Sequence, residues 1–285
     1  MALVVLVTVS LAVGLVVALA ASRYPVGGVR GAPRQLRFAA RLDPEAATGL
    51  ALTLALVLLI GCGLLLAVLS AVVRQDPDAI GLDAAAARWG ADHATPFTDD
   101  VLNAITHVGQ PGTIVALAVV LAVVETVRTR SPWVAPFLLI VVAGNGLVTT
   151  TIKHAADRVR PTLNPIAETL GPSFPSGHSS WSAAFFAAAA LLLARRRGRR
   201  ARIVLAGAAA AAAVAVASTR VLLDVHWLSD VVAGLALGWA WFAACAIAFG
   251  GRLLRFGATA EEIIEDAPPP RSGAPTTRRR SPTTS

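Results

Sequence analysis

The sequence predicts an all-α membrane protein, a polytopic bundle of helices that cross a lipid bilayer several times. Apolar residues make up 55% of the 285 residues and only 15% are charged, whereas ordinary soluble domains carry about 25% charged residues. The apolar residues are concentrated in seven stretches near the length of about 20 residues that a membrane span requires. This composition excludes a disordered protein and argues against a water-soluble enzyme.

The seven predicted spans follow one another along most of the chain. They lie at residues 2–22, 48–73, 111–127, 133–152, 179–194, 201–219 and 229–250. The first stretch ends in small residues at 18–22 that resemble a signal-peptide cleavage site. It has no positively charged region before it, and its apolar run is longer than that of a usual signal peptide. We therefore expect a retained transmembrane anchor at 1–22.

The basic residues are distributed unequally between the two sides of the membrane. If every stretch crosses, 19 of the 25 basic residues lie on one side, in the segments 23–47, 128–131, 195–202 and 251–285. The positive-inside rule makes this side cytoplasmic and places the N-terminus outside. The arginine runs are thus interpreted as topology signals rather than as a nucleic-acid surface. We expect an Arg-rich cytoplasmic loop at 23–47 and a disordered cytoplasmic tail at 251–285.

All five histidines lie on the predicted outer side. No residue near His93, His107 or His154 has a spacing that indicates a partner, so we interpret these three as side chains of water-facing segments. The two cysteines, Cys62 and Cys245, lie in apolar runs and are interpreted as small buried side chains. They are too few for a disulfide framework or a cysteine-based zinc site.

A pair of cations follows the fourth predicted span. Lys153 and Arg160 are seven residues apart, so on a helix they share one face two turns apart. Pro161 biases Arg160 away from helical geometry and helps to end the helix there. Two long cations on one face can converge on an anion, although basic residues at helix ends also extend toward water without any ligand.

The fifth predicted span is preceded by the segment Phe174-Pro-Ser-Gly-His-Ser-Ser180. Gly177 lets the backbone approach a ligand closely, and Ser176 or Ser179 can cap the helix. The free N–H groups of this helix start form an anion site, and His178 lies beside them. A plain loop-to-helix junction with an incidental histidine is the alternative interpretation.

The last predicted span begins with a histidine and an aspartate four residues apart. On a helix, His226 and Asp230 would be neighbours on one face. A carboxylate bonded to one imidazole nitrogen fixes the tautomer and leaves the other nitrogen free as a nucleophile or base. Arg220 supplies a further cation upstream. The alternative is a His–Asp pair that only satisfies itself at a helix start.

Together these three stretches resemble the type 2 phosphatidic acid phosphatase family, which also includes vanadium-dependent haloperoxidases and glucose-6-phosphatase. The resemblance consists of K-x6-RP at Lys153, PSGH at Pro175 and R-x5-H-x3-D at Arg220, in this order. It implies a six-span phosphatase-type core at 48–250 with an outward-facing active site, to which the first span is an addition.

The resemblance also implies a role for each matched residue. His226 would attack phosphorus and form a phosphohistidine, Asp230 would orient it, and His178 would protonate the leaving oxygen and then activate water. The phosphoryl oxygens would be held by Lys153, Arg160, Ser176, Gly177 and Arg220. Three fixed cations can take the place of a metal ion, and they would repel zinc from His178, His226 and Asp230. We therefore expect neither a metal nor a cofactor.

Two positions depart from the family pattern. Thr219 precedes Arg220 where the family commonly has serine, and it keeps the hydroxyl. Asp224 stands where glycine is frequent. An acidic group there either repels a diphosphate or faces water, so it bears on substrate preference rather than on catalysis.

The interpretation as a membrane lipid phosphatase has three rivals. A lipid phosphotransferase would use the same residues, and the sequence does not reveal the acceptor. A transporter or purely structural membrane protein would require three accidental motifs, and no paired broken helices are evident. A haloperoxidase would need bound vanadate, and the seven apolar stretches argue against this soluble type of enzyme.

The expected partners are a lipid phosphate, such as a polyprenyl diphosphate or a phosphatidic acid-type lipid, and membrane lipids. Nothing indicates an oligomeric state.

Overall fold

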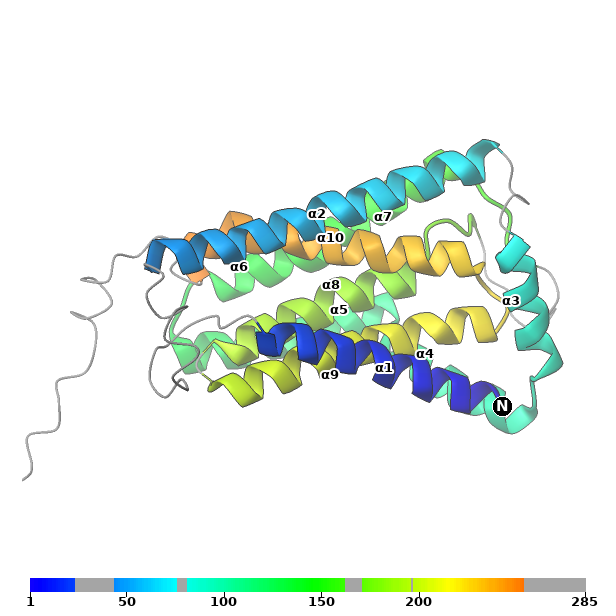
Figure 1. The fold of residues 1–285 in the computed structure, drawn as a ribbon, viewed down its shortest axis with the longest axis horizontal. Coiled ribbons are helices and arrows are strands. Elements are labelled where there is room, and N and C mark those ends of the chain that lie inside the picture. Colours follow the sequence, from blue (N-terminus) through cyan, green and yellow to red (C-terminus); the bar gives the residue numbers. More distant parts are fainter. Residues whose placement is uncertain (24–43, 76–80, 162–170, 196, 254–285) are drawn as a thin grey trace, which may run out of the picture.

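The computed structural model describes residues 1–23, 44–75, 81–161, 171–195 and 197–253. Every regular element in these ranges is a helix, and seven helical segments are long and apolar enough to cross a membrane. The predicted all-α, multi-span fold class is confirmed. The seven spans run side by side along the long axis of the molecule (Figure 1).

The helices follow the predicted order, with ends that differ by a few residues. The spanning segments are α1 (Ala2–Arg23), α2 (Pro44–Gln75), α5 (Pro111–Thr129), α6 with η3 and α7 (Val134–Leu139, Ile140–Gly144, Asn145–Ala156), α8 (Gly177–Ala194), α9 (Arg199–Leu222) and α10 (Leu228–Leu253). Helix α2 begins four residues before the predicted span at 48–73, and α10 ends three residues after the predicted span at 229–250. Residues 24–43 and 254–285 lie outside the described residues.

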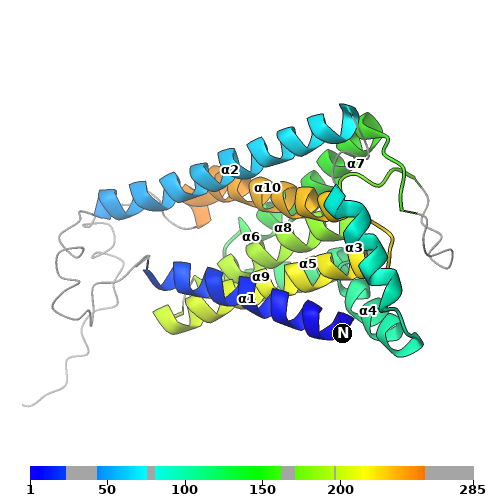
Figure 2. The same cartoon turned by 45° about the vertical axis from the view of Figure 1, so that its right-hand side comes forward.

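Two short helices lie between α2 and α5, in a segment for which the sequence predicts only a polar connection. These are α3 (Gly81–Asp92) and α4 (Pro96–Val108), and they cross one end of the bundle (Figures 1 and 2). Thr95 caps α4 and exchanges hydrogen bonds with Thr98, while Pro96 occupies the first helical position. Both helices contribute side chains to the polar cluster described below.

Small residues bring α10 against the start of α8. A Cβ atom on Gly234 would lie 2.5 Å from the carbonyl oxygen of Ser176 and 2.9 Å from the Cβ of Ser179. Only glycine therefore permits this approach, and it is reinforced by a hydrogen bond from the Ser176 N–H to the Asp230 carbonyl at 2.9 Å. The contact brings the second and third sequence motifs together.

The first helix packs along α9 through a second glycine contact. A Cβ atom on Gly14 would lie 2.8 Å from the Gly207 carbonyl oxygen, and one on Gly207 would lie 2.7 Å from that of Gly14. Such close small-residue contacts are typical of membrane helix pairs. Near the N-terminal end of α1, Leu6 packs in a buried cluster with Leu223 and Val225. The N-terminus therefore lies at the same end of the bundle as the turn that carries His226.

Candidate active site

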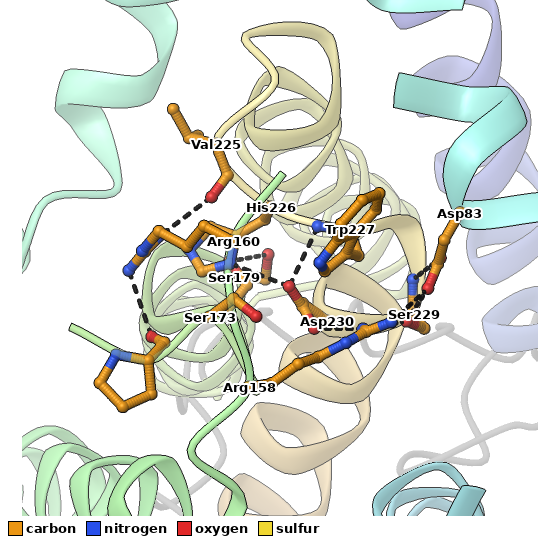
Figure 3. A network of polar contacts seen from close by, with 12 residues as sticks. Asp83, Arg158, Arg160, Ser173, Ser179, Val225, His226, Trp227, Ser229 and Asp230 are labelled. Atoms are coloured by element: carbon orange, nitrogen blue, oxygen red, sulfur yellow. Dashed lines mark hydrogen bonds and ion pairs between the residues drawn. The ribbon is translucent and has the colours of Figure 1, made fainter. Parts of the chain in front are cut away.

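The three motifs meet at the end of the bundle crossed by α3 and α4. Here α7 and α9 end, whereas α8 and α10 begin. All eight residues selected from the sequence lie at this end: Lys153, Arg160, Ser176, Gly177, His178, Arg220, His226 and Asp230. Figure 3 shows the polar contacts around His226 and Asp230.

His226 and Asp230 form the pair that their spacing predicts, but not by sharing a helical face. Since α10 begins at Leu228, His226 precedes the helix. Asp230 is instead the third residue of α10, and its Oδ2 atom accepts the Trp227 N–H at 3.0 Å, as in half of a capping box. The same Oδ2 atom lies 3.3 Å from the Nδ1 atom of His226. The capping interaction at the start of α10 therefore places the Asp230 carboxylate beside the His226 ring.

The turn that leads into His226 is stabilised by the backbone of Arg220. The carbonyl oxygen of Arg220 accepts hydrogen bonds from the N–H groups of Val225 and His226, at 3.2 and 3.1 Å. Within this turn Asp224 has a φ of 55°, a left-handed conformation that favours glycine. Asp224 is 2% exposed, so the alternative in which it faces water is wrong.

The hydrogen bonds of the His226 ring assign its tautomer. The Nη1 atom of Arg160 lies 3.1 Å from His226 Nε2, and a guanidinium can only donate. Nε2 is therefore the unprotonated nitrogen, and Nδ1 donates its hydrogen to Asp230. Burial, with smaller contributions from the charges of Arg160 and Lys153, lowers the pKa of His226 to about 4, although Asp230 opposes this shift. The ring is neutral near pH 7, and the lone pair on Nε2 accepts the hydrogen bond from Arg160.

The prediction that Lys153 and Arg160 share a helical face is wrong. Helix α7 ends at Ala156, because Asp157 adopts a left-handed conformation with a φ of 43°. The two cations nevertheless converge, since Lys153 Nζ and Arg160 Nη2 donate to the same carbonyl oxygen, that of Pro172, at 2.7 and 3.3 Å. Arg160 also donates to the Val225 carbonyl at 2.8 Å. Burial lowers the pKa of Arg160, and the Asp230 charge opposes this.

Arg220 contributes a third cation from the last turn of α9. Its side chain is buried and donates through Nη1 to the Oγ1 atom of Thr106 at 2.8 Å. Its Nε atom has no hydrogen-bond partner among the described residues. A buried donor of this kind is suited to an anion. The hydroxyl of Thr219 donates to the Val216 carbonyl within α9.

The start of α8 supplies backbone N–H groups. Ser176 occupies the N-cap position, but its hydroxyl accepts from Ser179 at 2.9 Å and caps no backbone N–H. The first N–H bonded inside the helix is that of Ser180, so the N–H groups before it are available to a ligand. A Cβ atom on Gly177 would meet only Lys153 Cε, at 4.0 Å, which leaves open space there. His178 is half-buried on this first turn.

Two residues of the polar cluster were missed by the sequence analysis. Arg158 is 5% exposed and donates through Nη1 to Asp230 Oδ1 at 2.8 Å and through Nη2 to Asp83 Oδ2 at 2.9 Å. Asp83, on α3, also accepts the Ser229 N–H at 2.8 Å. Arg158 lies inside the first motif and could have been noticed, because a buried Asp230 needs more than one partner. Asp83 lies 75 residues before Arg158, with no motif around it.

The remaining histidines lie apart from this cluster. His93 stacks on Trp89, with ring centroids 4.4 Å apart, and its Nδ1 atom contacts the Trp89 carbonyl. His107 and His154 are exposed. In the described part of the chain, no group of three or more His, Cys, Asp or Glu residues has a geometry that could hold a metal ion.

Fold and site together define a multi-span membrane helix bundle with a cation-lined His–Asp pair at one end. Residues 133–253, which include all eight selected residues, match the family model of the PAP2 superfamily. The resemblance inferred from the three motifs is therefore confirmed over this segment of the chain.

The relatives agree with this assignment. Phosphatidylglycerophosphatase B of Bacillus subtilis (strain 168) is 29% identical over 145 residues, which cover 50% of this chain and 71% of that protein. Lipid A 1-phosphatase of Rhizobium johnstonii is 38% identical over 120 residues, which cover 39% of this chain and 45% of that protein. The crystal structure of a transmembrane PAP2 type phosphatidylglycerolphosphate phosphatase from Bacillus subtilis superposes with a TM-score of 0.63 at 25% identity, covering 70% of this chain and 99% of that chain.

Proposed function

We propose that this protein is an integral-membrane phosphatase that removes phosphate from a lipid phosphate or polyprenyl diphosphate through a phosphohistidine intermediate. The observation that carries the proposal is the neutral His226 ring, with Nδ1 bonded to Asp230 and the lone pair of Nε2 directed at Arg160. A buried, oriented imidazole with an unprotonated nitrogen beside a cation is suited to attack on a phosphoryl group that the cation holds.

The proposed reaction has two steps. In the first, His226 Nε2 attacks phosphorus, a P–N bond forms, and the P–O bond to the lipid breaks while His178 gives its proton to the leaving oxygen. Asp230 stabilises the resulting imidazolium through Nδ1. In the second, His178 takes a proton from water, the water oxygen attacks phosphorus, and the P–N bond breaks to release phosphate. His178 regains its proton and His226 its lone pair, so the cycle closes.

The cations supply most of the proposed transition-state stabilisation. The three equatorial oxygens of a transferring phosphoryl group carry its charge, so positioning and fixed positive charge dominate such catalysis. Lys153 and Arg160 converge on one carbonyl oxygen, that of Pro172, and Arg220 presents a buried Nε. Ser176 and Gly177 lie at the helix start whose N–H groups would contact the same oxygens. We propose that this charge makes a metal and a cofactor unnecessary.

Arg158 and Asp83 are proposed as positioning residues. Arg158 holds Oδ1 of Asp230 while His226 occupies Oδ2, so the carboxylate is fixed at both oxygens. Asp83 in turn fixes the guanidinium of Arg158 and the N–H of Ser229. Neither residue would touch the substrate.

A lipid phosphotransferase with the same residues is the second candidate. The relatives named above are phosphatases, one of them acting on lipid A, which favours hydrolysis. We further propose the multi-pass arrangement in which the N-terminus and the active site are extracytoplasmic and the C-terminus is cytoplasmic. It is supported by the arginine distribution and by the packing of Leu6 against Val225. The proposed domain organisation consists of an N-terminal anchor, a cytoplasmic loop, a six-span core and a cytoplasmic tail.

Phosphate release from a panel of lipids tests the proposal. Purified protein in detergent is given phosphatidic acid, phosphatidylglycerophosphate and a polyprenyl diphosphate, and inorganic phosphate is measured. We expect release from at least one lipid in the presence of EDTA and inhibition by vanadate, which mimics the pentacoordinate phosphoryl state. Transfer of the phosphoryl group to a second lipid without phosphate release would favour the phosphotransferase, and no turnover of any lipid phosphate would overturn both.

A further inference from the structure

The first helix reaches the active-site end of the bundle, although it lies outside the segment that matches the family model. That match covers residues 133–253. Helix α1 runs along α9, and the N-terminus lies at the end of the bundle that α3 and α4 cross (Figures 1 and 2). The three motifs therefore do not account for the contacts that α1 makes there.

Helix α1 packs on α9 along one narrow stripe. Every fourth residue from Ala2 to Gly14 is buried, whereas most of the residues between them are exposed. Side chains four residues apart lie on one face of a helix. A Cβ atom added to Gly14 would lie 2.9 Å from the Cβ of Ala211 in α9. Such a close contact fixes the position of α1 along α9, and so it fixes which residues meet at the end of α1.

The start of α1 packs on the turn that carries His226. Leu6 is 4% exposed and belongs to a buried cluster with Leu223 and Val225, the residues on either side of Asp224. His226 follows Val225 directly. The cluster that contains Leu6 therefore ends one residue before the proposed nucleophile.

This turn has a conformation that its surroundings must maintain. Asp224 has a left-handed backbone, which costs free energy in any residue other than glycine and persists only where neighbouring structure holds it. The side chains of Leu223 and Val225 are buried in the cluster with Leu6 and with Leu102 of α4. Apolar packing from α1 and α4 thus helps to hold the turn.

The position of the turn affects two groups of the site at once. The Nη1 atom of Arg160 donates to the Val225 carbonyl at 2.8 Å and lies 3.1 Å from the Nε2 atom of His226. A displaced turn would therefore change the alignment of the attacking nitrogen with the phosphoryl group that Arg160 is proposed to hold.

We propose that α1 supports the active site and that Leu6 is a positioning residue for His226, an inference that rests on the proposed function. Leu6 does not touch the substrate. It acts through Leu223 and Val225, which fix the backbone of the turn, while the contact of Gly14 with α9 sets the height at which Leu6 meets them.

Hydrogen exchange tests the contact without any assay of activity. The N–H groups of residues 223–226 all donate hydrogen bonds, so their exchange reports opening of the turn. Leu6→Ala removes packing from the cluster, and the control Leu11→Ala makes the same change at a residue that is 63% exposed. We expect exchange at 223–226 to be about ten-fold faster in Leu6→Ala than in the control, with equal exchange at 236–245 in α10. Equal exchange at 223–226 would overturn the proposal.

Kinetics tests whether the contact acts on catalysis. The kcat of folded Leu6→Ala should be about ten-fold below that of Leu11→Ala, with a much smaller change in KM, because misalignment of the attacking atom lowers the rate more than it weakens binding. Leu6→Met keeps nearly the same volume and should restore kcat. If Leu6→Ala does not fold, Leu6→Val replaces it in both measurements.

The two measurements separate this proposal from the proposed function. An unchanged kcat in a folded variant whose turn exchanges faster would leave α1 a purely structural role and overturn the proposal. A wild type that hydrolyses no lipid phosphate would overturn the proposed function and the positioning role with it, whereas faster exchange in Leu6→Ala would still establish the contact.

Discussion

Arg158 and Asp230 are joined by a hydrogen-bonded ion pair, with Nη1 2.8 Å from Oδ1 and both side chains buried. The pair connects the segment after α7 with the first turn of α10, 72 residues apart in the chain. Asp83 continues the chain of contacts from α3 (Figure 3). A buried carboxylate bonded on both oxygens has little freedom to rotate, so the His226 ring that depends on it is held in one orientation.

Asp83→Asn should lower kcat about 10- to 100-fold, because small displacements of catalytic groups have costs of this size. Asp83 does not reach the proposed substrate position, so KM should change by much less than kcat. The control is Asp92→Asn, an exposed acid on the same helix. Equal kcat values for the two purified variants would remove Asp83 from the positioning role.

The pH dependence of kcat/KM should be bell-shaped. His226 must be neutral to attack, and its pKa is lowered to about 4, so activity should be lost as the pH falls through about 4. His178 must be protonated to release the lipid oxygen, so activity should fall again at higher pH. An acid limb at the ordinary histidine value near 6.5 would contradict the buried, neutral His226.

Asp230→Asn identifies which residue gives the acid limb. The Asp230 charge raises the pKa of His226, so its removal should shift that limb to lower pH. The rate should also decrease, because the ring loses its charged orienting acceptor. The measurement is a kcat/KM profile from pH 3 to 9 for wild type and variant, and an acid limb that stays in place would assign it to another group.

Cysteine labelling tests the proposed orientation. Cys62 and Cys245 are replaced, and single cysteines are placed at Ala94, between α3 and α4, or at Gly198, before α9; both positions are exposed. A membrane-impermeant reagent added to intact cells should label the first and spare the second. The reverse pattern would place the proposed active site in the cytoplasm.

Truncation after Gly257 should leave turnover intact. The removed segment is polar and rich in proline, a composition that buries too little apolar surface to stabilise a fold. Activity per inserted protein, compared with the full chain, checks this. Loss of turnover with normal membrane insertion would give the tail a role in catalysis.

The sequence predicted the spans well, because the apolar length that a bilayer demands is a local property that composition reveals. It also predicted which residues of the three motifs meet, but not by what geometry. Lys153 and Arg160 converge although α7 ends between them, and His226 reaches Asp230 from outside α10. Asp83 could not be predicted, because its contacts with Arg158 and Ser229 depend on how α3 crosses the end of the bundle.

Trapping of a phosphorylated protein tests the central claim most directly. The purified enzyme is mixed with a lipid substrate carrying radioactive phosphate, quenched in alkali within its first turnovers, and analysed for labelled peptides. We expect label on His226 that is stable in alkali and lost in acid, as a phosphoramidate bond requires. His226→Ala should show neither label nor turnover. Full turnover in folded His226→Ala, or label on another residue of the active wild type, would contradict the account.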